Sequence, residues 1–415
     1  MLDAASGLPS CRGSEWPTLM TSYTLALLPG DGTGRDVMVE AEKVLDVIEE
    51  LTPLSFARRK IPCGGQHFLE TGEEWPEGSF EFCRDEADVI LLGAIGWPGA
   101  FTEEGDLAGG AVILGLRSGL DLYANVRPIR LYEGVNHKIH GEFTQVWRAD
   151  SIDMVVVREN TEGLYHSLLR RSADKAMGRE VWEPAAMEFP GLDGEVAWDP
   201  RPISRAGSER VIRFAFELAQ RRNGAPVDGK TRVTCVDKSN VTRGCQLFNR
   251  VFYEIAESYP STDADHAFID AFTMWLVRNP EWFDVVVTPN MFGDIATDLA
   301  SVLQGGMGIA ASANIGDHHA MFEPVHGSAP KYAGRDTTNP VAMINSVGLM
   351  FDWLSQTHAD DDCAAVAKLI DQAVAEVLSG DVLTYDLGGS ANTSEVGNLV
   401  SQTLGSLLLK HYAIA

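Results

Sequence analysis

The sequence of 415 residues predicts an α/β fold with a largely buried sheet. Short apolar runs bounded by turn residues are typical of buried strands, and segments with apolar residues at helical spacing lie between them. Polar or charged residues directly follow several of these runs. Ligands of α/β folds bind at the ends of strands, so these residues are the first candidates for a functional site. The predicted strands are 23–28, 88–93, 154–157, 232–236 and 285–287, and the clearest helical patterns are 37–51, 209–220 and 364–378.

Composition and charge restrict the class of partner. Hydrophobic residues make up 45% of the chain and charged residues 22%, which is ordinary for a soluble globular enzyme. The net charge of −26 argues against a nucleic-acid partner or an anionic membrane surface. A small anionic substrate remains compatible, because local arginines can override the global field. The chain has no apolar run of membrane-spanning length and no secretory signal pattern, so we expect a cytoplasmic protein.

Six cysteines are scattered without CxxC or paired spacing, which fits reduced thiols better than a disulfide framework or a zinc site. Residues 1–21 are polar and aperiodic, and we expect a disordered leader there. Met20 directly precedes the first predicted strand and is an alternative start of the chain.

The first predicted strand ends in the glycine-rich segment 29–34, which reads PGDGTG. Such a segment invites comparison with a Rossmann dinucleotide loop. However, Arg35 does not supply the third glycine, and the acid expected roughly 20 residues further on is absent. We therefore predict a tight turn near a ligand, and not a Rossmann fold.

Two acids follow the predicted strand 285–287, in the segment 290–298 (NMFGDIATD). Asp294 and Asp298 are four residues apart and would share one face of a helix beginning near Gly293. Two like charges on one face need compensation, and Mg²⁺ or Mn²⁺ with oxygen ligands would provide it. The alternative from these residues alone is that Asp294 caps the helix and Asp298 is solvated.

Arginine, lysine and a further acid complete the candidate residues. Arg117, Arg127 and Arg158 could bind carboxylates through their guanidinium groups, although a single arginine is more often a surface or ion-pair residue. Lys238 follows the predicted strand 232–236. Asp270 lies inside an apolar stretch, where a buried carboxylate would need a partner.

These motifs resemble a known family, the β-decarboxylating dehydrogenases of the isocitrate/isopropylmalate dehydrogenase family. The matching segments are LLPGDG at 27–32, the metal segment at 290–298, EPVHGSAP at 323–330 and TYDLGG at 384–389. They cover essentially everything after residue 22, in the order of the family. The resemblance implies an isopropylmalate dehydrogenase-like, two-lobed α/β fold with a large mixed sheet.

The resemblance also assigns roles to individual residues. Arg117, Arg127 and Arg158 would bind the substrate carboxylates, and Tyr165 and Lys238 would be catalytic. Asp270, Asp294 and Asp298 would hold Mg²⁺ or Mn²⁺, with Asp270 and Lys238 reaching across from a second subunit. The residues implied to contact the cofactor are His326, Gly327, Ser328, Ala329, Pro330, Lys331, Tyr332, Asn339 and Tyr385.

The resemblance further implies a division into lobes. Residues 22–122 plus 305–415 would form a large cofactor-binding lobe, and residues 123–304 a small lobe with the contact of a homodimer that shares its active sites. Residues 167–202 are rich in Trp, Pro and Gly with little periodicity, and we expect an arm that packs on another subunit.

The expected reaction is the metal-dependent oxidative decarboxylation of a 2-hydroxy acid with a 3-carboxylate. The apolar segment before Arg117, with Ile113 and Leu114, resembles that of 3-isopropylmalate enzymes. Tartrate and D-malate enzymes look similar there, while residues 159–163 resemble the isocitrate group, so isocitrate and homoisocitrate also remain open. An alternative from another class is a non-catalytic regulatory subunit of a heteromeric isocitrate-type enzyme.

The choice between NADP and NAD depends on residues 331–334. NAD-using members usually have an acid there, whereas Lys331 and Tyr332 resemble the NADP-using isocitrate enzymes. Tyr385 matches a further phosphate contact, but Gly389 and Asn279 replace residues expected to complete it. The sequence favours NADP, with appreciable NAD activity.

Overall fold

One large sheet runs through the whole molecule. The computed structural model describes residues 20–103, 105–185, 187, 191, 194 and 196–414. In these residues ten strands form a sheet in the order β2-β1-β3-β12-β11-β4-β7-β10-β8-β9. The strands are β1 (Thr21–Gly30), β2 (Leu54–Lys60), β3 (Val89–Ala94), β4 (Ala124–Arg130), β7 (Asp153–Glu159), β8 (Arg232–Asp237), β9 (Asp263–Phe268), β10 (Val285–Thr288), β11 (Ala311–Ile315) and β12 (Ala320–Pro324).

The sheet is mixed, as predicted. Strand β11 is antiparallel to both of its neighbours, β12 and β4, and β4 is also antiparallel to β7. The other pairs are parallel. Antiparallel strands at the centre of the sheet are incompatible with the parallel order of a Rossmann fold. The expectation that the glycine-rich segment does not begin a Rossmann fold is therefore confirmed.

Strands from the two predicted lobes occupy different halves of the sheet. The half β2-β1-β3-β12-β11 comes from residues 22–122 and 305–415, which we call the large lobe. The half β4-β7-β10-β8-β9 comes from residues 123–304, which we call the small lobe. The halves meet where β11 pairs with β4, with Asn314 opposite Asn125.

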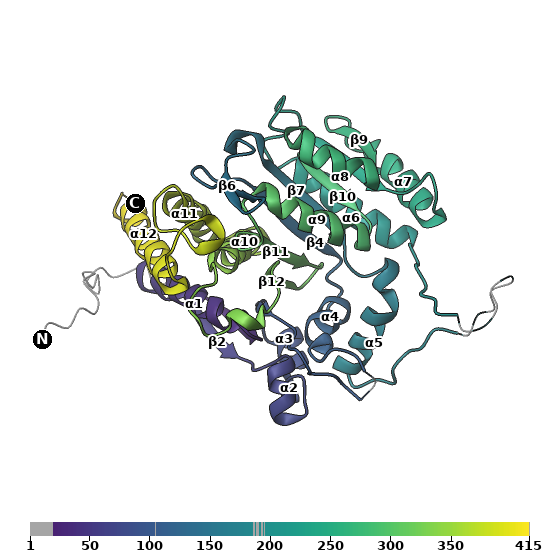
Figure 1. Cartoon of the computed structure of the whole chain (residues 1–415), viewed down its shortest axis with the longest axis horizontal. Helices are drawn as coiled ribbons and strands as arrows, with labels where there is room; N and C mark the ends of the chain where they lie inside the picture. The colour runs from purple at the N-terminus through teal and green to yellow at the C-terminus, as the bar shows by residue number, and fades with distance from the viewer. Residues whose placement is uncertain are drawn as a thin grey trace, which may run out of the picture.

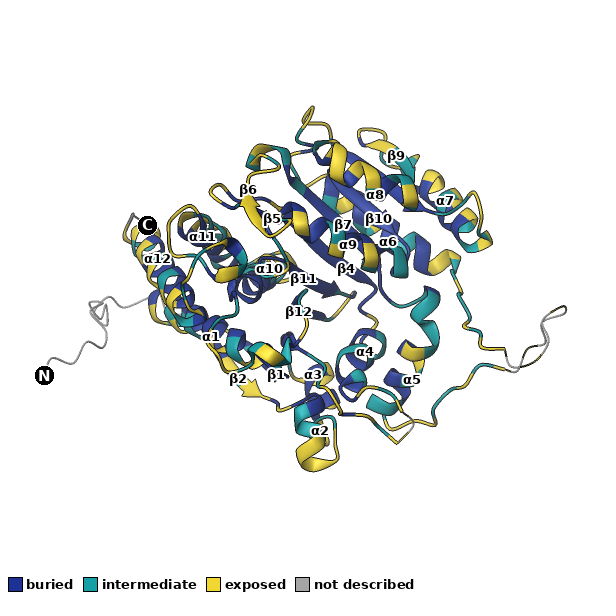
Figure 2. Ribbon diagram, viewed as in Figure 1, coloured by how far each residue is buried: buried dark blue, intermediate teal, exposed yellow. Residues whose placement is uncertain are grey.

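Helices cover both halves of the sheet (Figure 1). Helices α1, α10, α11 and α12 lie with the large lobe, and α6, α7, α8 and α9 with the small lobe. Figure 2 shows the strands as mostly buried and the outer helix faces as exposed. The helices are α1 (Thr33–Leu51), α2 (Gly65–Thr71), α3 (Ser79–Asp85), α4 (Gly110–Gly119), α5 (His166–Ala176), α6 (Arg205–Ala219), α7 (Arg243–Ala256), α8 (Ile269–Arg278), α9 (Asn290–Leu303), α10 (Val341–His358), α11 (Asp361–Leu378) and α12 (Thr393–Ile414); a small second sheet joins β5 (His137–Ile139) to β6 (Glu142–Thr144).

The predicted arm begins with a helix. Helix α5 covers residues 166–176 and packs closely against α4, since a Cβ on Gly115 would lie 2.8 Å from the Cβ of Ala176. Leu169 and Ala173 are buried and lie four residues apart, which is the spacing of one helix face. The polar residues around them make this spacing hard to recognise in the sequence. The expectation of little periodicity is thus wrong for 167–176. The described residues between 177 and 202 contain no helix or strand, and part of the predicted arm lies outside the described residues.

Other sequence-based expectations concern the cysteines, the leader and the membrane. The five described cysteines are buried and free, and Cys11 lies outside the described residues. Residues 1–19 of the predicted leader also lie outside the described residues. Burial raises the pKa of Cys63 and Cys83 to about 12, which favours the protonated thiol. Within the described residues, no helix is both long enough and apolar enough to cross a membrane.

Candidate active site

Three arginines from different elements are buried near the junction of the lobes. Arg127 is on β4, Arg158 is on β7, and Arg117 is in the last turn of α4. All three are less than a tenth exposed. Buried guanidinium groups need partners. The interpretation of these residues as surface arginines is wrong, whereas ion pairs are observed for Arg117 with Glu323 and for Arg158 with Asp294.

Each arginine is held by at least one side chain from a distant part of the chain. Arg117 donates from Nη2 to Glu323 Oε1 on β12 at 2.5 Å. Arg127 donates from Nε to Asn125 Oδ1 at 2.9 Å and from Nη1 to Thr297 Oγ1 at 2.5 Å. These contacts fix two guanidinium groups on opposite sides of the β11–β4 junction.

Arg158 is the centre of the polar network. Its Nε and Nη2 donate to Asn290 Oδ1 at 3.0 and 2.7 Å, and its Nη1 donates to Asp294 Oδ1. The hydroxyl of Tyr165 donates to the other oxygen of Asp294, at 2.9 Å. The predicted catalytic tyrosine, one substrate arginine and one metal acid therefore share a single carboxylate.

The charges in this cluster are strongly coupled. Burial, followed by the positive charge of Arg127, lowers the pKa of Arg158, and burial and Arg117 lower that of Arg127. Burial alone would raise the pKa of Asp294, but the charges of Arg158 and Arg127 outweigh it and the pKa is lowered. Buried guanidinium groups that repel one another would be stabilised by an anionic ligand.

Helix α9 presents both predicted metal acids. It begins at Asn290 after Pro289, so Asp294 and Asp298 lie one turn apart within the helix, and Asp294 is not its cap. Arg127 lies 3.8 Å from Asp294 and 3.9 Å from Asp298. Burial raises the pKa of Asp298, and the negative charge of Asp294 adds to this effect. Two carboxylates under this mutual repulsion are suitable ligands for a hard cation.

Lys238 and Asp270 form a second group. Lys238 follows β8, Asp270 is in the first turn of α8, and Lys238 Nζ donates to Asp270 Oδ1 at 2.6 Å. The Asp270 side chain is 68% exposed, so the expectation of a buried acid is wrong. The apolar neighbours Phe272 and Leu276 are buried on another face of α8. Among the described residues of one chain, no three acids, histidines or cysteines lie close enough together to hold a metal ion. Asp270 is therefore not near Asp294 and Asp298 of the same chain.

The predicted cofactor loop lies against the glycine-rich turn. Thr33 N donates to Ser328 O at 2.9 Å, and a Cβ on Gly32 would lie 2.2 Å from that same oxygen. Gly32 also has φ +53°, a conformation that favours glycine. The glycines thus allow close approach between this turn and the loop 326–332.

Within the loop, His326 has an unpaired buried nitrogen. Its Nδ1 is 3.0 Å from Gly327 O and therefore carries the proton, which makes Nε2 an acceptor. Nε2 is buried and has no partner in the described structure. Burial lowers the pKa of His326, which favours this neutral form. Ala329 has φ +36°, and Pro330 begins the short helix that contains Lys331 and Tyr332.

Lys331, Tyr332 and Tyr385 lie together at the surface. The ammonium of Lys331 is 4.6 Å from the ring centre of Tyr332, and the rings of Tyr332 and Tyr385 are 5.6 Å apart. Asn339 is buried instead, with Nδ2 donating to Asp386 at 3.1 Å and Oδ1 accepting from Val341 N at 3.0 Å. Both ends of its amide are already used in the structure.

Two of the predicted substrate residues, Ile113 and Leu114, line a cavity of about 310 Å³ between α4 and α5, whereas the three buried arginines are not among its lining residues. Ile113 and Leu114 face Leu168 across it, but Arg171 and Lys175 of α5 also line the wall. Arg171 is paired with Asp106 at 3.2 Å. The segment before Arg117 is apolar and predicts an apolar substrate environment. The structure adds the charged side chains of Arg171 and Lys175, which belong to α5 and are distant in sequence.

Sequence reasoning also missed the residues that position the arginines, namely Asn125, Asn290, Thr297 and Glu323. Asn290 directly follows β10, where a polar residue at a strand end is a usable signal. In the sequence, Glu323 is notable only as the first residue of the matching segment 323–330. Its contact with Arg117 spans 206 residues and has no local signature.

Comparison with known proteins identifies the family. The family model described as isocitrate/isopropylmalate dehydrogenase matches residues 24–400. The chain belongs to this family. Its enzyme class, that of the decarboxylating dehydrogenases, follows from this membership.

Curated relatives cover nearly the same length. A 3-isopropylmalate/3-methylmalate dehydrogenase of Methanocaldococcus jannaschii is 38% identical over 92% of this chain and 98% of its own. A homoisocitrate dehydrogenase of the same organism is 40% identical over 90% of this chain and 95% of its own. A 3-isopropylmalate dehydrogenase of Thermobifida fusca is 39% identical over 91% of this chain and 96% of its own.

Solved structures show the same fold. The crystal structure of an isocitrate dehydrogenase from Methylococcus capsulatus matches with a TM-score of 0.71 at 32% identity, over 92% of this chain and 99% of that one. A β-decarboxylating dehydrogenase from Thermococcus kodakarensis, in its apo form, matches with a TM-score of 0.69 at 34% identity. The match covers 93% of this chain and 97% of that one. The family and the fold implied by the sequence motifs are confirmed.

Proposed function

We propose that this enzyme catalyses the metal-dependent oxidative decarboxylation of a 2-hydroxy acid with a 3-carboxylate, with hydride transfer to NAD(P). The observation that carries this proposal is the cluster of Arg127, Arg158, Tyr165 and Asp294. It combines buried cations for a carboxylate, a phenolic proton and a carboxylate ligand for a metal. The reaction needs all three at one place.

The donor set fits Mg²⁺ or Mn²⁺ if two copies of the chain contribute. Asp294 and Asp298 supply carboxylate oxygens from α9, and Asp270 of the partner subunit would supply a third. Bound there, the metal would polarise the substrate hydroxyl and stabilise developing negative charge as a Lewis acid.

Exposed apolar residues support a shared site in a homodimer. On α8, Met274 and Val277 share the face of Asp270, and on α9, Ile295 and Val302 share the face of Asp298, all four being at least 36% exposed. Apolar residues at these positions are typical of an interface. An interface along α8 and α9 would bury them and bring Asp270 and Lys238 of one subunit towards α9 of the other.

Each side chain then has a chemical role. Lys238, in its neutral form, would accept the hydroxyl proton as the nicotinamide receives the hydride. The buried arginines would hold the carboxylate that leaves as CO₂. Tyr165 would donate a proton to the carbon from which CO₂ departs. Burial and the charge of Asp294 raise the pKa of Tyr165, which keeps the phenol protonated and ready to act as an acid.

Replacing Tyr165 by phenylalanine should separate the two halves of the reaction. Hydride transfer should continue, because Tyr165 is not the proposed base, while protonation after decarboxylation slows by about 10²-fold or more. Stopped-flow detection of the reduced cofactor, together with product analysis, measures both halves. Wild-type rates for both would place the acid elsewhere.

We propose 3-isopropylmalate as the leading substrate. Ile113, Leu114 and Leu168 offer aliphatic contacts, and Arg171 is neutralised by Asp106. The curated 3-isopropylmalate dehydrogenases among the relatives agree with this proposal. Homoisocitrate remains the second candidate, because Arg171 and Lys175 line the same cavity and one relative carries that name.

The substrate proposal predicts that kcat/KM for 3-isopropylmalate exceeds that for isocitrate by about 100-fold or more. An additional carboxylate against Ile113 and Leu114 would be desolvated without a free cation, at a cost of several kcal/mol. Parallel assays with isocitrate, homoisocitrate, tartrate and D-malate measure the ranking. A preference for isocitrate refutes the assignment, and no turnover with any acid favours a regulatory subunit.

We propose that the cofactor is NADP, with appreciable use of NAD. The exposed group of Lys331, Tyr332 and Tyr385 offers one cation and two hydroxyls to a 2′-phosphate. The unpaired acceptor of His326 is available to an amino group of the adenine. A Cβ at Gly327 would meet nothing within 4 Å, so there is open space beside this residue of the loop.

Exchanging Lys331 for aspartate should reverse the cofactor preference. The variant loses one attraction to the 2′-phosphate and gains a repulsion, so kcat/KM for NADP should fall about tenfold or more. Activity with NAD should be retained or increased, which also serves as the control for folding. If wild type prefers NAD and Lys331→Asp does not strengthen that preference, this residue is not the selector.

A further inference from the structure

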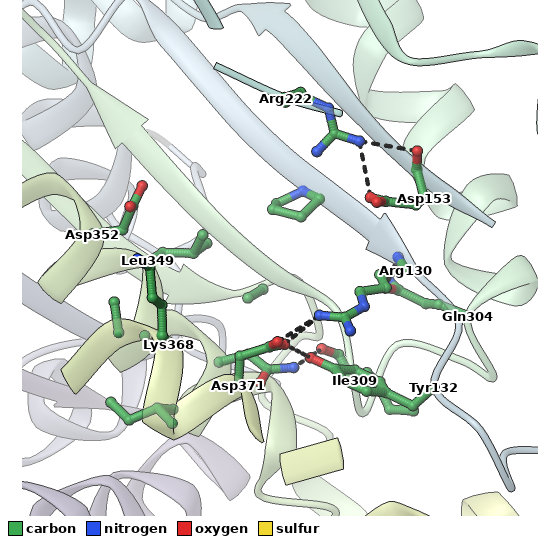
Figure 3. A pocket seen from close by; sticks show the side chains of 16 residues that line it. Arg130, Tyr132, Asp153, Arg222, Gln304, Ile309, Leu349, Asp352, Lys368 and Asp371 are labelled. Atoms are coloured by element: carbon green, nitrogen blue, oxygen red, sulfur yellow. Dashed lines mark hydrogen bonds and ion pairs between the residues drawn. The ribbon is translucent and has the colours of Figure 1, made fainter. Parts of the chain in front are cut away.

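A second cavity, shown in Figure 3, lies between the lobes. It is on the face of the sheet opposite the side chain of Arg127. Side chains alternate between the two faces of a strand. Asn125 and Arg127 share one face of β4, where they are hydrogen-bonded, whereas Pro128 and Arg130 line the second cavity. On β11, Ser312 and Asn314 contact Asn125, whereas Ala311 lines the second cavity. This rear cavity is therefore distinct from the active site.

The rear cavity is large enough for a small organic molecule. Its volume is about 360 Å³, within the range of ligand pockets. The small lobe supplies Pro128, Arg130, Asp153 and Arg222, and the large lobe supplies residues of β11, α10 and α11. Apolar side chains form much of the wall, namely Pro128, Ile309, Ala311, Leu349, Ala367 and Ile370.

Free hydrogen-bond donors outnumber free acceptors around the cavity. Lys368 has no hydrogen bond or ion pair within the described residues. Arg130 donates to both oxygens of Asp371 through Nη1 alone, at 2.7 and 2.6 Å. Arg222 donates from Nε to Asp284 at 2.7 Å and from Nη2 to Asp153 at 2.9 Å, with no partner for Nη1 in the described contacts.

The carboxylates of the cavity are largely engaged. Both oxygens of Asp371 accept from Arg130, and one also accepts from the hydroxyl of Tyr132 at 3.0 Å. Asp153 is paired with Arg222. Asp352 accepts from Gln356 at 2.7 Å, and burial raises its pKa against the opposing charges of Arg221 and Lys368. The unused polar capacity of the cavity is therefore mainly cationic.

We propose that the rear cavity binds a small organic anion with an apolar body, either a carboxylate or a phosphate monoester. The anionic group would lie between Lys368 of the large lobe and Arg130 and Arg222 of the small lobe. The apolar body would contact Leu349 and Ile370. Such a ligand would touch both lobes and so bias their relative position. Binding of a substrate between the lobes on the other face of the sheet also depends on that position.

The test uses calorimetric titration of the full chain with phenyl phosphate and benzoate at constant ionic strength of about 0.1 M, with neutral benzyl alcohol as a control. We expect saturable binding of at least one anion and none of the alcohol. The anion that binds more tightly identifies the class of natural ligand. Absence of saturable binding for both anions overturns the proposal.

Two variants locate the binding. Lys368→Gln removes the unpaired cation and should weaken binding about tenfold or more, while Lys410→Gln, at an exposed position of α12, is the matched control. Gly348→Met should fill the cavity, because a Cβ at Gly348 makes only an ordinary contact with Ile370 at 3.4 Å. Gly348→Ala is its control. Wild-type affinity in either Lys368→Gln or Gly348→Met would show that the anion binds elsewhere.

Discussion

Replacing Asp298 by asparagine should lower kcat by about a hundredfold or more, because one ligand of the proposed metal is lost and the metal supplies several kcal/mol of transition-state stabilisation. The Asp298 side chain is 57% exposed and its ion pair with Arg127 is long, at 3.9 Å, so the free energy of unfolding should change by less than about 0.5 kcal/mol. Steady-state kinetics and thermal unfolding measure the two effects.

Asp298 is a cleaner target than Asp294. Removing Asp294 also leaves the buried Arg158 without its carboxylate partner, which would destabilise the fold. Higher Mn²⁺ should restore part of the activity of Asp298→Asn, whereas Asp381→Asn, at an exposed position far from α9 in sequence, should behave as wild type. Full activity of the wild-type enzyme in excess chelator would contradict the metal assignment.

Mixing two inactive variants should restore activity if the active site is shared. Lys238→Ala removes the proposed base, and Asp298→Asn removes a metal ligand. In a mixed dimer, one site combines the intact Asp298 of one subunit with the intact Lys238 of the other, and the second site carries both defects. Free exchange of equal amounts should therefore give about a quarter of the wild-type activity, because half of the dimers are mixed.

The control for subunit exchange is a mixture of each variant with itself, which should remain inactive. Size-exclusion chromatography of differently tagged subunits establishes that mixed dimers form. Mixed dimers without activity would show that Lys238 serves the Asp298 of its own chain, and the geometry of a shared site would then be wrong.

Local patterns in the sequence predicted β1, β3, β7, β8 and β10 of the large sheet, but not β2, β4, β9, β11 and β12. The apolar run before Asn290 predicted β10, and the spacing of Asp294 and Asp298 predicted their common helix face, because both features depend on residues a few positions apart. The missing third glycine after Gly34 correctly excluded a Rossmann loop. The family motifs pointed to the arginines that are buried in the structure and to the loop 326–332, since their residue types and order are readable without a structure.

Contacts between distant residues required the tertiary structure. The antiparallel insertion of β11 between β12 and β4 brings Glu323 to Arg117 and places the rear cavity at the lobe junction, and no local pattern encodes that strand order. Asp270 was expected to be buried because its neighbours are apolar. A helix presents successive residues to different faces, so Asp270 is exposed while Phe272 is in the core. The local sequence thus determined part of the elements and the residue types from which the chemistry is proposed, whereas the packing of the elements decided which side chains meet.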